Sequence, residues 1–243
     1  MLRNLIKRIF FPGFDLNTRS RYRWLPRYFS FPGDVLDVGC GNGALCYAAF
    51  KLGNNVLGVS FSVTDIKRNQ NYFSSFVHSD RLQFKTLNAY DLLTLNKQYD
   101  QIICSEALEH IKNDDIVVKH FNRLLKINGV LHLCCPNAKH REHCLGRTDG
   151  PEDGGHVRDG YTLETYSVLL ERSGFKIVES LGIGAPALLK CDKLVNFFRN
   201  KWGALAASPF FILVWPFLSF LDQPVTQEPY SLYVKAVKIE NVV

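Results

Sequence analysis

The segment at residues 35–43, VLDVGCGNG, constrains the fold of this chain more than any other. Its β-branched, apolar start predicts a buried strand, and it carries one acid, Asp37, two positions before Gly39. Glycine adopts positive φ angles and has no Cβ, so Gly39, Gly41 and Gly43 allow a sharp turn that a ligand can approach closely. Helix-forming residues follow from Ala44. The segment therefore predicts a strand, a ligand-binding turn and a helix.

The rest of the chain repeats this alternation of strands and helix-length segments. Strands separated in this way predict a parallel sheet covered on both faces, with ligands at the carboxyl ends of the strands. A helix through residues 123–126 is expected to stop at Asn128 and Gly129. The further predicted strands are residues 54–62, 82–87, 99–105, 130–135, 175–181 and 230–237, and residues 63–76 form the crossover helix after the second strand.

Over residues 30–182 the order of these motifs resembles that of class I S-adenosylmethionine-dependent methyltransferases. The resemblance implies an α/β, Rossmann-like sheet of seven strands with helices on both faces. It also implies S-adenosyl-L-methionine as the cofactor, with Asp37 near its ammonium and the glycines near its ribose. The segment from Glu106 to His110 resembles the signature after strand four. The candidate cofactor-binding residues are Asp37, Gly39, Cys40, Gly41, Asn42, Gly43, Ser60, Phe61, Asn88, Ala89, Tyr90, Ser105 and Glu106.

Two positions depart from the pattern of that family. Ser60 stands where the family normally has an acid that accepts two hydrogen bonds from the ribose, and a neutral acceptor binds more weakly than a charged one. Relatives that act on lipids and sterols sometimes carry a hydroxyl there, so Ser60 favours an apolar substrate; alternatively, it satisfies only local backbone. Asn88 replaces an aspartate, but its carbonyl oxygen can accept the same bond from adenine. Alternatively, Asn88 is a turn residue at a strand end.

Acceptor-side residues are expected after strand five. His156 is the preferred base for removing a proton from an acceptor hydroxyl, because imidazole titrates near neutral pH, and His143 and His140 are the next candidates. Arg158 and Tyr161 are candidates for orienting a polar or anionic acceptor. The alternative is that this turn only caps a helix that begins at Thr162.

Composition indicates one enzyme domain in a reducing compartment. The chain has 243 residues, of which 47% are hydrophobic, enough for a single core. Its seven cysteines include no C-x-x-C pair, which favours free thiols in the cytoplasm over disulfides. Cysteine and histidine spacing predicts no metal site, and no carboxylate cluster for metal-assisted transfer can be assembled from the sequence.

Charge and hydropathy single out two segments. Residues 1–28 contain seven basic residues and one acid, which accounts for the whole net charge of +6. Residues 1–11 have the spacing of a basic amphipathic helix, so residues 1–30 are interpreted as a basic anchor or a cap and residues 31–243 as the methyltransferase domain. Residues 204–221 are uncharged but contain Pro209 and Pro216, which argues against a membrane span. They belong to an insertion at residues 183–228, interpreted as broken helices that cap the substrate cleft, contact a membrane face or pair with a second subunit; a plain extension of the core is the alternative.

The predicted function is methyl transfer from S-adenosylmethionine, most consistent with an oxygen acceptor on a small molecule, a lipid-linked intermediate or a glycan precursor. Nucleic acid is not expected as a partner, because the chain beyond residue 28 is neutral and residues 105–108 lack the tetrad of amino-methylating enzymes. The expected location is the cytoplasm, in contact with the inner face of a membrane if the anchor operates. A catalytically silent cofactor-binding or membrane-associated protein with the same fold is the alternative.

Overall fold

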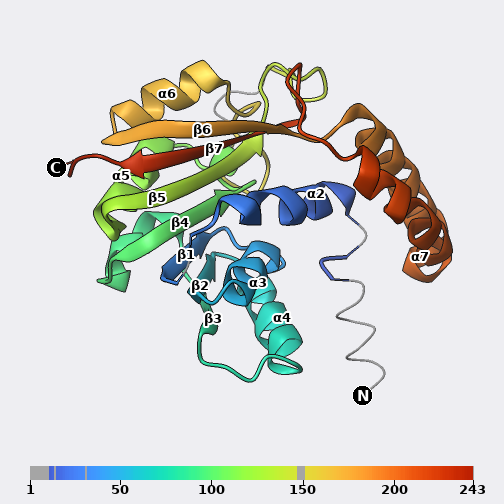
Figure 1. Ribbon diagram of the computed structural model, residues 1–243, viewed down its shortest axis with the longest axis horizontal. Coiled ribbons are helices and arrows are strands. Elements are labelled where there is room, and N and C mark those ends of the chain that lie inside the picture. Colours follow the sequence, from blue (N-terminus) through green and yellow to red (C-terminus); the bar gives the residue numbers. More distant parts are fainter. Residues whose placement is uncertain (1–10, 14, 31, 147–150, 243) are drawn as a thin grey trace.

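The protein is built on one seven-stranded sheet with strand order β3-β2-β1-β4-β5-β7-β6 (Figure 1). The structure is a computed structural model that describes residues 11–13, 15–30, 32–146 and 151–242. β7 runs antiparallel to β5 and β6, whereas β1 to β5 pair in parallel. This topology confirms the predicted Rossmann-like α/β class. The strands are β1 (Asp34–Val38), β2 (Asn55–Ser60), β3 (Leu82–Thr86), β4 (Tyr99–Ser105), β5 (Leu125–Pro136), β6 (Phe175–Ile183) and β7 (Ser231–Lys238).

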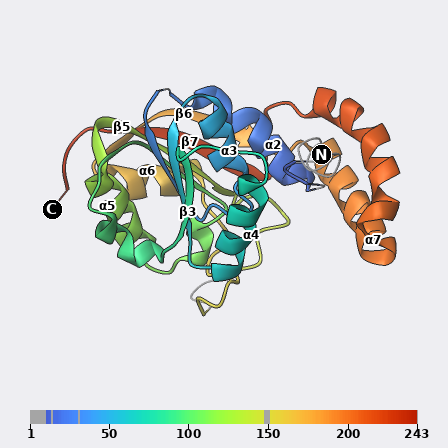
Figure 2. The same cartoon turned by 90° about the horizontal axis from the view of Figure 1, so that it is seen from below.

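Helices cover both faces of this sheet, and each face has its own apolar core (Figure 2). Leu36 and Val38 of β1 pack in the core with α5 and α6, whereas Val35 packs in the core with α3 and α4. A strand buried on both faces is apolar at nearly every position, which explains why Val35, Leu36 and Val38 surround the single acid Asp37. The helical elements are α2 (Leu16–Trp24), η1 (Leu25–Tyr28), α3 (Ala44–Lys51), α4 (Val63–Ser74), η2 (Ala89–Leu95), η3 (Leu108–His110), α5 (Asp114–Leu124), α6 (Leu163–Glu171) and α7 (Pro186–Leu221).

The prediction of a helix through residues 123–126 is wrong about where the helix ends. α5 ends at Leu124 and β5 begins at the next residue, Leu125. Asn128 has a φ of 63° within β5, and the β4–β5 register shifts between Tyr99 and Gln101. The Asn-Gly pair therefore forms an irregularity inside a long strand instead of ending a helix.

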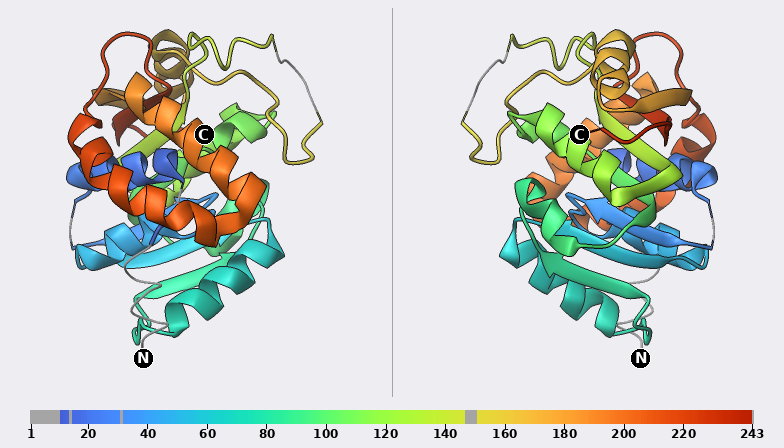
Figure 3. Two further views of the ribbon diagram at one scale, coloured as in Figure 1. Left: turned by 90° about the vertical axis from the view of Figure 1, so that its right-hand side faces the viewer. Right: turned by 90° about the vertical axis from the view of Figure 1, so that its left-hand side faces the viewer.

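The insertion between β6 and β7 is helical, as expected, but its break lies elsewhere. α7 is interrupted at Gly203, which has φ 84° and ψ 169°, whereas Pro209 and Pro216 lie inside its second arm. Glycine adopts this conformation without the steric penalty that a Cβ would bring. The two arms project from the end of the sheet at which the parallel strands terminate, beside α2 (Figures 1 and 3). None of the helices in the described part of the chain combines the length and apolarity needed to cross a bilayer.

Buried carboxylates connect α7 to α2. Asp222 accepts hydrogen bonds from Ser20 Oγ at 2.7 Å and from Trp24 Nε1 at 3.2 Å, and Asp192 accepts one from the Leu16 backbone N–H at 3.0 Å. The arginine-containing helix α2 is thus part of the folded body. Residues 1–10, the expected amphipathic anchor, lie outside the described residues. The domain boundary at residues 30 and 31 stays a prediction.

Candidate cofactor and acceptor site

A cleft lies at the carboxyl ends of β1, β2, β3 and β4, and it consists of two adjoining cavities. They measure about 290 Å³ and 250 Å³ and share the lining residues Gly39, Gly41 and Glu106. Twelve of the thirteen predicted cofactor residues line one or both cavities. The larger cavity contains Ser60, Phe61, Asn88, Ala89 and Tyr90, and the smaller one contains Asp37, Cys40, Asn42 and Ser105.

Gly43 is the exception, because it lines neither cavity. A Cβ at this position would lie 2.7 Å from a ring carbon of Phe73, so this glycine permits close packing of the turn on α4. Gly39 has a different requirement: its φ is +74°, and a Cβ would lie 2.4 Å from the Cβ of Ala107. Its N–H also donates to the Val59 carbonyl at 2.9 Å, which fixes the turn against β2.

Asp37 is a buried acid beside the smaller cavity. It is 2% exposed, and its carboxylate accepts a hydrogen bond from the Cys46 thiol at 3.0 Å. Burial raises its pKa to about 6. A buried carboxylate favours a cationic partner. This environment would suit the ammonium of the cofactor, and the role that the family resemblance implies for Asp37 stays a prediction.

The sequence left two interpretations open for Ser60 and Asn88, a cofactor contact or a local backbone contact, and the cofactor contacts stay predictions. Both line the larger cavity. The Ser60 hydroxyl also accepts the Ser62 N–H at 3.2 Å, and the Asn88 side chain accepts the Tyr90 N–H at 3.0 Å. Each side chain therefore shapes local backbone while remaining at the cleft.

Arg21 lines the smaller cavity, although no sequence motif identifies it as a site residue. Its Nη1 lies 3.5 Å from Glu106 Oε1. Glu106 has a φ of 52° and also accepts the Ser231 hydroxyl at 3.0 Å. A non-glycine residue in this region is uncommon outside sites where the surrounding structure holds it. Basic charge near the N-terminus was the available signal, but the sequence could not show that Arg21 reaches the cleft.

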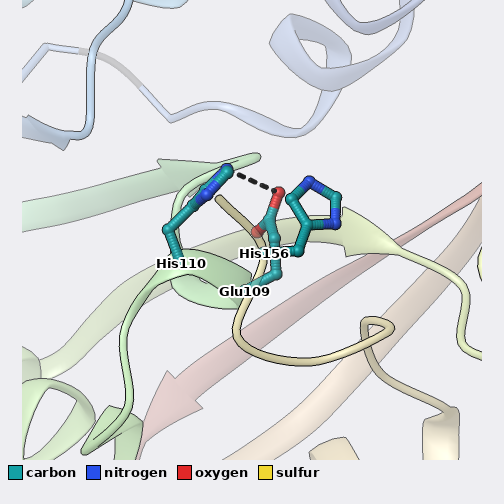
Figure 4. A group of neighbouring side chains, drawn as sticks. All are labelled: Glu109, His110 and His156. Atoms are coloured by element: carbon teal, nitrogen blue, oxygen red, sulfur yellow. Dashed lines mark ion pairs between the residues drawn. The ribbon is translucent and has the colours of Figure 1, made fainter. Parts of the chain in front are cut away.

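Glu109, His110 and His156 form a cluster next to the larger cavity (Figure 4). Glu109 is 0% exposed, and burial together with the charge of Glu106 raises its pKa to about 8. Its Oε1 lies 3.8 Å from His110 Nε2, and the His110 and His156 rings meet edge to face at 4.7 Å. His110 lines the cavity directly. The sequence predicts a role for His156, whereas Glu109 and His110 stand in it only as part of a family signature.

The loop that carries His156 is fastened to η3 and α5. The Val157 N–H donates to the Glu109 carbonyl at 3.0 Å, and Arg158 Nη2 donates to the carbonyls of Ile111 at 2.7 Å and Lys112 at 2.8 Å. Arg158 also pairs with Asp114.

Tyr161 also connects this loop to α5, because its hydroxyl donates to Asp114 Oδ2 at 2.6 Å. Neither Arg158 nor Tyr161 lines the cleft. Their substrate-binding role stays a prediction, and their contacts favour positioning of the loop. The helix start expected at Thr162 is confirmed, since its side chain accepts the Thr165 N–H.

The other two candidate bases lie apart from this cleft. His140 and His143 are 8% and 9% exposed and pack on Tyr230. Burial lowers the pKa of both imidazoles. His140 lines a different cavity, at the start of α7. Neither residue lines either cavity of the cleft, whereas His110 lines the larger one and the ring of His156 lies against that of His110.

The strand order and the glycine turn at this cleft define a class I S-adenosylmethionine-dependent methyltransferase fold. The chain belongs to the methyltransferase-domain family, whose profile matches residues 14–180. It is 28% identical over 159 residues to the mitochondrial ubiquinone biosynthesis O-methyltransferase of Rattus norvegicus, covering 61% of this chain and 46% of that protein. The chain thus spans about half the length of this curated relative.

Solved structures share the fold at low sequence identity. A SAM-dependent methyltransferase from Archaeoglobus fulgidus superposes with a TM-score of 0.61 at 18% identity, covering 96% of this chain and 98% of the other. The magnesium protoporphyrin IX methyltransferase of Synechocystis PCC 6803, solved with bound SAH, gives a TM-score of 0.57 at 19% identity, covering 91% and 81%. These similarities extend over the sheet and support S-adenosylmethionine as the cofactor of the fold.

Proposed function

We propose that this protein transfers a methyl group from S-adenosylmethionine to an oxygen atom of a small-molecule acceptor. The observation that carries the proposal is the continuous cleft, with the buried acid Asp37 beside one cavity and the Glu109, His110 and His156 cluster beside the other. Relatives named as O-methyltransferases support oxygen as the receiving atom.

The chemistry needs little from the protein beyond alignment, exclusion of water and removal of one proton. The bound cofactor supplies an activated methyl group on its sulfonium. Asp37 attracts the ammonium, and the turn at Gly39 and Gly41 gives the cofactor close access to the backbone. His156 or His110 accepts the proton of the acceptor hydroxyl. His110 Nδ1 lies 3.0 Å from the Gly155 carbonyl; as the donor in that bond, it leaves Nε2 with the lone pair.

The test is methyl transfer from labelled cofactor to phenolic acceptors and to lipid and glycan extracts. We expect label in the acceptor fraction, with at least about 100-fold loss in His156→Ala if it is the base. His78→Ala, at an exposed site after α4, is the matched control. Binding of the demethylated cofactor without any transfer would favour the silent alternative instead.

We also propose that the acceptor is apolar or lipid-linked and that α7 contacts a membrane surface. Leu213, Phe217 and Phe220 on its second arm are 73%, 77% and 79% exposed. The acids Asp192 and Asp222 of this region are buried against α2, while Lys190 and Lys201 are exposed and Lys193 pairs with Glu142. An apolar and basic surface of this kind suits an anionic bilayer. The location at the inner face of a membrane follows from this proposal.

Vesicle flotation tests the membrane contact. The intact chain should float with phosphatidylserine-containing vesicles, and Phe217→Ser with Phe220→Ser should reduce the floating fraction several-fold. Ile239→Ser, an exposed apolar site after β7, is the control. A chain lacking residues 1–11 separates the contribution of the expected anchor. Equal flotation of the double variant and the intact chain would exclude α7 as the contact.

A further inference from the structure

We propose that the cavity between the loop after β5 and the start of α7 binds a phosphate group carried by the methyl acceptor. This inference rests on the proposed methyl transfer, since it names a class of acceptor. The cavity measures about 700 Å³, which is larger than either cavity of the cleft and within the range of small-molecule sites, roughly 300–1,000 Å³. Its lining comes from three segments of the chain, at residues 140–142, 184–193 and 227–228.

Positive charge predominates in this lining. Three basic side chains, Arg141, Lys190 and Lys193, line the cavity together with two acids, Glu142 and Glu228. Lys193 Nζ pairs with Glu142 Oε1 at 2.6 Å, whereas Arg141, Lys190 and Glu228 form no ion pair within the described part of the chain. The lining therefore keeps one positive charge in excess, and two cationic groups are available to an anion.

His140 adds a hydrogen-bond donor that is almost buried. This residue is 8% exposed, and its Nδ1 accepts the Glu142 N–H at 3.3 Å. Because burial lowers the pKa of this imidazole, the ring is neutral and carries its proton on Nε2. Among the described residues Nε2 has no hydrogen-bond partner, yet it is not enclosed, so it opens onto the cavity. A donor of this kind beside excess positive charge indicates an anionic ligand.

The beginning of α7 supplies further donors. Gly184 and Pro186, where α7 follows β6, line the cavity, and the first arm of α7 extends over residues 186–202 (Figure 1). The N–H groups in the first turn of a helix have no partner within that helix. Those of Ala187 and Leu188 have none elsewhere in the part of the chain that the structure describes. N–H groups at the positive end of a helix dipole commonly bind phosphate.

Tyr230 connects this cavity to the cleft. Its ring packs on His140 with 5.2 Å between ring centroids, and it lies against Gly184, where a Cβ would be 2.6 Å from the Tyr230 Cβ. The hydroxyl of the next residue, Ser231, donates to Glu106 at 3.0 Å, and Glu106 lines both cavities of the cleft. Two consecutive residues thus link the linings of the two sites. An extended acceptor can place its hydroxyl in the cleft and its phosphate beside α7.

Octyl phosphate and inorganic phosphate are the probes for this site. Calorimetry on the full chain should detect one site, with tighter binding of octyl phosphate because its alkyl chain adds apolar contact. Lys190→Gln should weaken octyl phosphate binding about 3- to 5-fold. His140→Phe, which keeps the ring packing but removes the donor, should weaken it about 10-fold. Glu228→Gln should strengthen it several-fold, because the unpaired acid is removed.

Controls separate the source of the phosphate and the state of the fold. Lys176→Gln, at an exposed position of β6, should bind like the unaltered chain, and circular dichroism checks the folding of each variant. His140→Phe should float with phosphatidylserine-containing vesicles as the unaltered chain does. An equal loss of flotation and of octyl phosphate binding would assign the cavity to a bilayer headgroup and overturn the acceptor assignment. Equal affinity for the two probes would assign it to free phosphate and overturn it as well.

The outcomes distinguish this proposal from the proposed function, because phosphate binding requires no methyl transfer. Failure of both probes to bind, or unchanged binding in Lys190→Gln and His140→Phe, would overturn the phosphate site. Methyl transfer in a chain that binds neither probe would overturn this site alone and leave the enzyme proposal intact. Phosphate binding without transfer to any acceptor would contradict the enzyme proposal and the acceptor role of the cavity together.

Discussion

At the scale of single residues, Asp37 connects burial with cofactor recognition. Because its pKa is raised to about 6, this acid is protonated below that pH in the cofactor-free protein. Protonation removes the charge that attracts the ammonium. We expect the affinity for S-adenosylhomocysteine to rise with pH through the range around 6 and to level off above it, measured by calorimetry.

Substituting Asp37 tests the same interaction. Asp37→Asn should weaken binding of S-adenosylhomocysteine by about 10- to 100-fold, the loss of a charge-assisted hydrogen bond, and should remove the pH dependence. Asp80→Asn, at an exposed residue before β3, is the control. A variant that binds normally across the whole pH range would place the ammonium elsewhere.

The same acid should lower stability at neutral pH. Its pKa in the folded state is above the unfolded value, so its contribution to the free energy of unfolding is largest below about pH 4 and declines as pH rises through about 6. The rise of the Asp37 pKa from its ordinary value of 3.8 to about 6 is equivalent to roughly 3 kcal/mol. Asp37→Asn should therefore stabilise the cofactor-free protein at pH 7 but not at pH 4, as measured by urea unfolding. Equal effects at both pH values would contradict this explanation.

Substitutions at Gly39 can separate the destabilisation caused by backbone strain from that caused by steric contact. Gly39→Ala should destabilise the protein, because the new Cβ meets Ala107 Cβ and the residue keeps a positive φ. Adding Ala107→Gly should recover the steric part but leave about 1–2 kcal/mol of backbone strain. Urea unfolding of the single and double variants measures both parts, and a double variant no more stable than Gly39→Ala would exclude the contact.

At the scale of elements, the loop after β5 and the helix α5 act together. Removal of the Arg158 guanidinium leaves Asp114 with the Tyr161 hydroxyl and the Asp115 N–H as its partners and frees two carbonyls. Arg158→Ala should increase hydrogen exchange of the Val157 amide about 10- to 100-fold, corresponding to roughly 1.5–3 kcal/mol for charged hydrogen bonds. Arg123→Ala, at an exposed position near the end of α5, serves for comparison. Unchanged protection of Val157 would show that Arg158 does not hold the loop.

At the scale of the whole molecule, the connection between α2 and α7 unites residues about 200 positions apart. Asp222→Ala removes the acceptor for Ser20 and Trp24, and both donors are left buried. We expect faster hydrogen exchange in α7, by about 10-fold or more, with little change in the central strands. Gln223→Ala at the neighbouring exposed position should have no such effect, and uniform loss of protection in the sheet would contradict a local connection.

The sequence determined the elements whose causes are local. Alternating strands and helices, the turn at Gly39 and the capped start of α6 follow from hydrophobic pattern, conformational freedom and side-chain capping. The resemblance of the sequence motifs to those of class I methyltransferases identified twelve of the residues that line the cleft, and these stand at or near strand ends. The predicted helix end at Asn128 is wrong because an Asn-Gly pair is compatible both with the end of a helix and with an irregular strand.

Tertiary structure determines which side chains, distant in the sequence, lie together at the cleft. Arg21 reaches the cleft because α2 lies against α7, and His156 joins Glu109 and His110 because Arg158 fastens its loop. His140 and His143 are equally plausible bases by residue type, but packing on Tyr230 places them in another environment. Residue type fixes the pKa and donor capacity that a side chain brings, whereas charge pairing and hydrogen bonding depend on distances between groups that only the folded chain sets.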